Sequence, residues 1–112
     1  MAFHGNNAIE AWLTLNGTGT ISIDDSYRIS SVSDEGTGKY FVNFSDSFAN
    51  ANYCHAAFCR EDGTNGNRGQ VVVVGARTNP TTSQTRIFSI DTNGSANPRD
   101  CGQICIMFAG DQ

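Results

Sequence analysis

The sequence predicts an all-β fold, an antiparallel sandwich of about eight short strands. Apolar and polar residues alternate with a period of two, in runs that are short for helices. Gly, Asn, Asp and Ser cluster between these runs, and pairs such as Asn16-Gly17, Asp62-Gly63 and Asn93-Gly94 tolerate the backbone angles of tight turns. No segment of about ten residues or more carries the apolar stripe of an amphipathic helix, so helix content is expected to be minimal.

The predicted strands follow one another along the chain with turn residues between them. A single helical turn, around Ser45 to Asn50, is the most helix that the pattern allows. In order, the strands are expected at Ile9 to Leu15, Thr20 to Ile23, Tyr27 to Ser33, Lys39 to Phe44, Tyr53 to Arg60, Gln70 to Arg77, Arg86 to Asp91 and Gln103 to Phe108.

Several of these strands carry apolar residues on both faces. Tyr40, Val42 and Phe44 share one face of the fourth strand, while Phe41 lies on the other, and Val71 to Val74 is apolar on both. Trp12 likewise points away from its neighbours Ala11 and Leu13. The outer face of a lone sandwich is usually polar. Either chains associate and bury these outer faces, or loops cover ordinary central strands, and the pattern leaves both explanations open.

Length and charge limit the domain count and the partners. The 112 residues fit one domain, which we place at residues 9–112, after an N-terminal arm at residues 1–8. Seven Lys plus Arg and a net charge of -4 leave no basic stripe for nucleic acid or for an anionic membrane. No apolar run is long enough to span a bilayer, and residues 1–11 lack the pattern of a secretory signal, so we expect synthesis in a cytoplasm.

The four cysteines predict buried thiols rather than a metal site. The spacings of Cys54, Cys59, Cys101 and Cys105 are not those of a zinc knuckle. On regular strands the first two would face opposite ways and the last two would share a face. We therefore expect reduced, buried thiols, no metal and no cofactor. A disulfide from Cys54 or Cys59 to the C-terminal pair stays open as an alternative.

Catalytic constellations are weak in this sequence. His55 follows Cys54 directly, which places the two side chains on opposite faces of a strand and disfavours a dyad. Most acidic residues lie at turns, where Asp is common for backbone reasons. The two Gly-Thr-Gly turns, Gly17 to Gly19 and Gly36 to Gly38, lead into strands and lack the helix and Lys of a phosphate loop. We predict that the protein is not an enzyme.

Residues 10 to 53 contain a series of short motifs in a specific order and spacing. The segment contains a Trp-led strand, an Asn-Gly-Thr-Gly turn at residues 16–19, a Ser-Ser-Val triplet at residues 30–32, a Gly-Thr-Gly-Lys-Tyr-Phe-Val-Asn-Phe run at residues 36–44 and Ala51-Asn52-Tyr53. In this order and spacing it is similar to the C-terminal, receptor-binding tip module of phage and prophage tail fibres. The resemblance implies a homotrimer in a virion, made in the cytoplasm of a bacterial host and used to attach to the host surface.

Two Gly-, Asn-, Thr- and Arg-rich loops form the predicted binding surface, at Glu61 to Gly69 and Thr78 to Thr85. Their polar, weakly charged side chains suit a host surface glycan. The candidate ligand-binding residues are Arg60, Asn65, Asn67, Arg68, Arg77 and Asn79. Two alternatives remain: a capsid or tail decoration protein that cements a particle by binding other virion proteins, and a free-standing lectin-like domain.

Overall fold

The computed structural model describes residues 9–60, 70–74, 78–91 and 97–111, with only the backbone for Arg60, Gln70–Val74 and Asp91. Within these residues the chain forms strands and no helix, which confirms the predicted all-β fold. The strands are β1 (Ala11–Asn16), β2 (Ser22–Tyr27), β3 (Ile29–Asp34), β4 (Lys39–Phe44), β5 (Cys54–Arg60), β6 (Gln70–Val74), β7 (Gln84–Asp91) and β8 (Gln103–Ala109).

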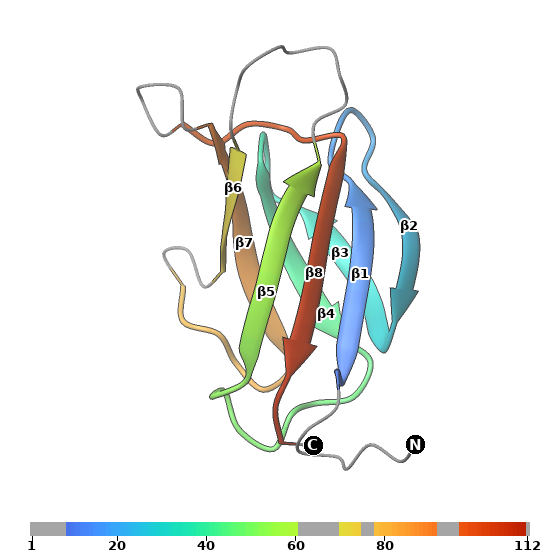
Figure 1. Cartoon of the computed structure of the whole chain (residues 1–112), viewed down its shortest axis with the longest axis vertical. Helices are drawn as coiled ribbons and strands as arrows, with labels where there is room; N and C mark the ends of the chain where they lie inside the picture. The colour runs from blue at the N-terminus through green and yellow to red at the C-terminus, as the bar shows by residue number, and fades with distance from the viewer. Residues whose placement is uncertain (1–8, 61–69, 75–77, 92–96, 112) are drawn as a thin grey trace.

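The strands form two antiparallel sheets that pack face to face (Figure 1). Sheet 1 has the order β2-β1-β8-β5, and sheet 2 has the order β3-β4-β7-β6. Because side chains alternate along a strand, each sheet places one set of residues between the sheets. The buried set includes Leu13, Leu15, Ile104, Ile106 and Phe108 from sheet 1 and Tyr40, Val42, Phe44 and Ile87 from sheet 2.

Aromatic rings fill the core at the end of the sandwich where β1 begins and β8 ends, which we call the terminal end. Phe44 packs edge-on against Phe48 and Phe108, with ring centroids 5.0 Å apart in both pairs. Phe48 also stacks on Tyr53 at 4.5 Å. No helical turn forms around residues 45–50, because the Phe48 amide donates instead to the Thr82 carbonyl and its ring enters the core.

One residue, Arg28, carries the chain from sheet 1 to sheet 2. The prediction that the third strand begins at Tyr27 was wrong, because Tyr27 ends β2 and the corner falls at Arg28, whose φ of 59° is unusual for a residue other than glycine. The Arg28 guanidinium lies 3.3 Å from Glu10 and 3.1 Å from Asp46, so two ion pairs hold this corner.

The two Gly-Thr-Gly turns meet at the opposite end of the sandwich, which we call the turn end. The buried Tyr40 hydroxyl is shared between the Gly17 carbonyl at 2.7 Å and the Asp100 carboxylate at 3.3 Å. The same carboxylate accepts from the Gly38 amide at 2.9 Å. A Cβ at Gly17 would overlap the Tyr40 side chain, and Gly38 has a φ of 67° against the Arg99 backbone. In this chain, the glycine turns and Tyr40 of the residue 10 to 53 motifs therefore hold the two sheets together at the turn end.

Candidate interaction surface

The outer face of sheet 1 is built by two cross-strand rows of side chains. In the first row, Tyr27 of β2 lies opposite Trp12 of β1, Trp12 opposite Met107 of β8, and Met107 opposite Ala56 of β5. The second row runs from Asp25 through Thr14 and Cys105 to Phe58. Outward residues on neighbouring strands lie within contact distance, so the rows form one continuous surface.

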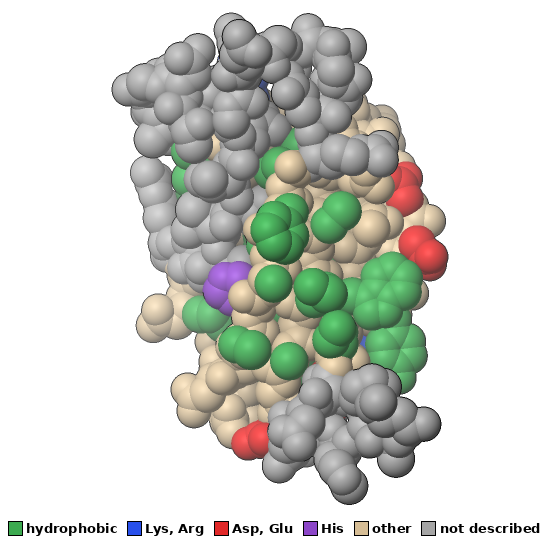
Figure 2. All heavy atoms as spheres, in the orientation of Figure 1, with side chains coloured by type: hydrophobic (Ala, Val, Ile, Leu, Met, Phe, Trp, Pro, Cys, Tyr) green, Lys and Arg blue, Asp and Glu red, His purple; other side chains and the backbone are tan. Residues whose placement is uncertain are grey.

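This surface is mostly apolar and open. Phe58 is 66% exposed, Ile9 51%, Tyr27 50% and Met107 42%. Figure 2 shows the hydrophobic side chains gathered over the exposed face of the molecule. We call the side chains of Ile9, Trp12, Tyr27, Ala56, Phe58 and Met107 the apolar face. A contiguous patch of this kind on a small protein indicates a site for binding another molecule.

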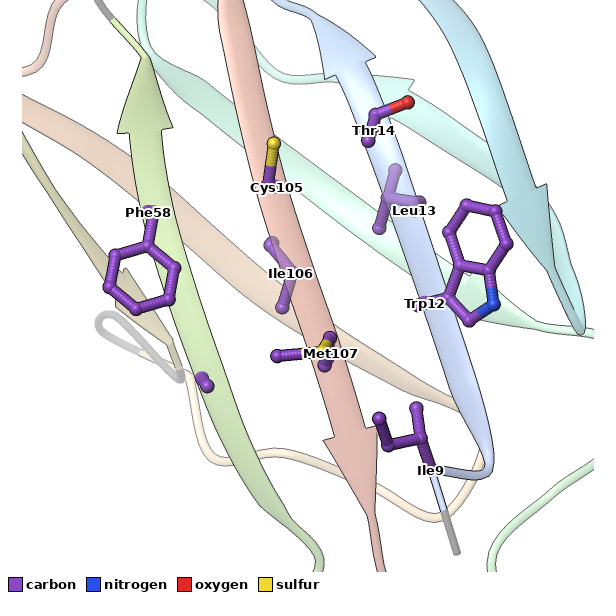
Figure 3. A pocket seen from close by; sticks show the side chains of 9 residues that line it. Ile9, Trp12, Leu13, Thr14, Phe58, Cys105, Ile106 and Met107 are labelled. Atoms are coloured by element: carbon purple, nitrogen blue, oxygen red, sulfur yellow. The ribbon is translucent and has the colours of Figure 1, made fainter.

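A shallow depression of about 340 Å³ runs along β8 within the apolar face. Phe58 flanks it on one side and Trp12 on the other, while Cys105 and Met107 lie between them on β8 (Figure 3). Because the side chains of Thr14 and Cys105 are short, the surface between Phe58 and Trp12 is recessed. A second hollow of about 180 Å³ adjoins it toward Cys54 and His55.

The two edges of sheet 1 differ in charge. β2 carries Asp24 and Asp25 on an exposed strand, an arrangement that discourages pairing with another sheet. β5 has no charged residue from Cys54 to Cys59 apart from the titratable His55, and most of these side chains are exposed. The apolar face therefore extends to the edge of the sheet on the β5 side.

The outer face of sheet 2 is different, because cationic side chains cover its aromatic rings. The Arg86 guanidinium lies 5.5 Å from the ring centroid of Phe41 and 5.0 Å from that of Phe88, and the Lys39 ammonium lies 5.6 Å from the Phe88 ring. Polar side chains continue this face onto β3, where the Asn43 amide donates to the Ser31 hydroxyl at 3.0 Å. The described side chains of β3, β4 and β7 thus give this part of sheet 2 a mixed, solvated surface.

The cysteines are free thiols in four different settings. Cys54 is exposed, and Cys59 packs against the core, so the prediction that these two face opposite ways is confirmed. Burial raises the pKa of the Cys59 thiol to about 12, a change that the Ser89 hydroxyl 3.5 Å away partly offsets. A thiol with so high a pKa stays protonated and unreactive at neutral pH.

Two predictions about the C-terminal cysteines were wrong. Cys101 is buried, whereas Cys105 faces outward into the depression, so they do not share a face. The reason is that Cys101 precedes β8 and lies outside its alternation, with its thiol donating to the Gln103 carbonyl at 3.3 Å. Only Cys101 is fully buried, contrary to the prediction for all four. In the described part of the chain, no three potential metal ligands cluster.

The structure separates the two predicted ligand-binding residues that it describes. Arg60 ends β5 at the turn end, where its backbone pairs with Gln103. Asn79 is exposed at the terminal end, two residues before Thr81, whose carbonyl accepts from the Tyr53 hydroxyl. Because they lie at opposite ends of the sandwich, these two do not form one site. Asn65, Asn67, Arg68 and Arg77 lie outside the described residues.

The sequence analysis identified only part of the apolar face. The sequence predicted that Trp12 points opposite to Ala11 and Leu13 but not which of these faces is outward, and it did not single out Phe58 and Met107. A usable signal was present, since buried Ile104, Ile106 and Phe108 place Met107 on the outer side of the same strand. Joining Phe58 to it requires the pairing of β5 with β8, which are far apart in the sequence.

Comparisons of the chain with family models, with curated proteins and with solved structures found no match. Among the described residues, no helix is long and apolar enough to cross a membrane. The features of this chain that bear on its function are therefore the surface chemistry described above and the motifs of residues 10 to 53.

Proposed function

We propose that this chain is a virion structural and receptor-binding protein, a tail-fibre tip module that assembles with copies of itself and contacts a glycan on the host cell surface. The observation that carries the proposal is the apolar face of sheet 1, which suits association with another protein surface. The assignment to a fibre, to a homotrimer and to a virion rests on the resemblance.

The interlocked turn end is consistent with a scaffold that displays variable loops. Gly17, Gly38 and Tyr40 belong to the resembling motif, and each is fixed by a close backbone approach or a buried hydrogen bond. A scaffold fixed by such residues can carry exposed loops that differ in what they contact. We propose the host glycan as the ligand of Arg60, Asn65, Asn67, Arg68, Arg77 and Asn79. Since Arg60 and Asn79 lie at opposite ends, we propose two separate contacts.

The proposal is tested by measuring mass and sugar binding on the full chain. Light scattering should give the mass of a trimer, which is three times the 12.0 kDa of one chain. The same preparation on a bacterial glycan array should bind a subset of surface polysaccharides. Arg60→Ala and Asn79→Ala should each weaken those signals. An array without signal, together with no binding to bacterial cells, would contradict a receptor-binding role, and shortened polysaccharide chains would contradict a role without catalysis.

A second candidate is a capsid or tail decoration protein. The breadth of the apolar face favours this candidate, because a cement protein buries a broad face against the viral shell rather than presenting loop tips. It predicts a single chain in solution that co-sediments with virus particles and gives no glycan signal. A trimer that binds sugar in the absence of particles would exclude it.

A further inference from the structure

The apolar face has the composition of the centre of a protein interface. Trp12, Tyr27, Phe58 and Met107 are of the residue types that are enriched where two proteins meet. No outward side chain described on β1, β8 or β5 at the two central rows is charged, and interface centres are depleted of charge in the same way. A solvated outer face would carry Lys, Glu or Asp at these positions.

The area of the face matches what a stable self-contact needs. A fully covered aromatic side chain buries roughly 150–250 Å², so the exposed parts of Tyr27 and Phe58 offer roughly 200 Å² together. Ile9, Trp12, Ala56 and Met107 raise the apolar area to roughly 400–500 Å². A standard interface takes about 800 Å² from each partner, of which about 65% is apolar in homodimers. The face supplies an apolar core of that size.

Net charge restricts where two copies can touch. Each chain carries a formal charge of -4, so two copies repel one another on average, and a contact free of acidic groups avoids adding to that repulsion. The acidic residues of sheet 1, Asp24 and Asp25, lie at the β2 edge of the face. A contact centred on β8 and β5 keeps these carboxylates at the rim, where water screens them.

The shape of the face is complementary to itself. Phe58 protrudes at the β5 edge, and the depression beside it lies between Phe58 and Trp12 (Figure 3). The same surface therefore offers both a projecting ring and a hollow lined by Met107 and Cys105. In a threefold ring each copy meets the next through a different part of its surface, so one chain must carry both the projecting ring and the hollow that receives it.

We infer that the outer face of sheet 1 is the contact between copies of this chain, with Phe58 of one copy entering the depression beside Trp12 of the next. This inference rests on the self-association in the proposed function and adds the surface that makes it. The Phe58 ring is the anchor of the contact, since a protruding aromatic that fills a pocket typically carries much of the binding energy.

The test compares two variants that add the same charge on opposite outer faces. Phe58→Asp places a carboxylate in the centre of the proposed contact, and Ser33→Asp places one on the exposed β3 strand of sheet 2. Light scattering across a concentration series should show wild type and Ser33→Asp as the same oligomer. Phe58→Asp should raise the dissociation constant at least about tenfold. Since Phe58 is largely exposed, circular dichroism should show that the variant is folded.

A second measurement uses the wild-type chain alone. Trp12 is the only tryptophan and lies in the proposed contact, so acrylamide should quench its fluorescence less as association proceeds with rising concentration. If Phe58→Asp assembles like wild type and Trp12 quenching does not change with concentration, the assigned face is wrong while self-association stands. If wild type stays a single chain at every concentration, both the inference and the proposed homotrimer fail.

Discussion

The two sheets bury their inner faces alike, yet their outer faces treat aromatic rings in opposite ways. On sheet 2, Phe88 points outward and is still only 5% exposed, with Lys39 and Arg86 over its ring. On sheet 1, Phe58 points outward and is 66% exposed, with no cationic side chain over it among the described residues. Long cationic side chains thus shield the outward rings of sheet 2 from water, whereas the Phe58 ring of sheet 1 stays accessible.

The largest expected effect is the difference in the free energy of unfolding between alanine variants of these two phenylalanines. Phe88→Ala should lower the free energy of unfolding by about 3 kcal/mol, because it removes a buried ring and leaves space under Arg86 and Lys39. Phe58→Ala should change it by no more than about 0.5 kcal/mol when measured on the single chain. Urea unfolding at low protein concentration measures both values. Equal losses for the two variants would remove the distinction drawn between the faces.

The next effect compares tyrosines inside and outside the sandwich. Tyr40→Phe should lower the free energy of unfolding by about 1–2 kcal/mol, since it leaves the Gly17 carbonyl without the hydroxyl that joins the sheets at the turn end. Tyr27→Phe, on the half-exposed apolar face, should have almost no effect. Thermal unfolding of the two variants in parallel measures the difference. A large loss for Tyr27→Phe would show that its hydroxyl has a role that the structure does not explain.

A smaller effect should follow from uncovering the rings of sheet 2. Arg86→Ala should lower the free energy of unfolding by about 1 kcal/mol through lost cation–π contact and packing. The variant should also bind more of a hydrophobic dye, because Phe41 and Phe88 become accessible. Arg86→Met keeps most of the packing and serves as the matched control, with a smaller loss. Unchanged dye binding in Arg86→Ala would contradict the covering role of the guanidinium.

The smallest effect on stability concerns two thiols at the ends of β5. At pH 8, Cys54 should react with iodoacetamide at least about a hundredfold faster than Cys59, whose pKa burial raises to about 12. The Cys59 thiol contributes stability that is fully present below its ordinary pKa of 9.0 and is lost as the pH rises toward about 12. Mass spectrometry of labelled peptides measures the rates, and similar rates would place both thiols in water.

The fold was predictable because its signals are local. Period-two alternation located all eight strands and predicted the shared face of Tyr40, Val42 and Phe44, which the structure buries. The boundary at Tyr27 was missed because Arg28 turns the corner with a positive φ, and the ion pairs that hold it there come from Glu10 and Asp46, both 18 residues away.

The candidate site was less predictable because it depends on strand pairing. Phe58 and Met107 became neighbours only when β5 paired with β8, and Cys101 left the expected face because the chain before β8 does not follow the strand alternation. The loop residues proposed for glycan contact were chosen by composition alone. Composition carries no information about which end of the sandwich a loop occupies, so Arg60 and Asn79 were grouped although they lie far apart.

The antiparallel pairing of β1 with β8 also determines how the protein can be attached to other objects. The start of β1 and the end of β8 lie side by side at the terminal end, where the Glu10 amide donates to the Phe108 carbonyl at 2.8 Å. The described chain therefore begins and ends at the same pole of the sandwich. An attachment made at this pole lies at the opposite end from the turn end, where Arg60 ends β5.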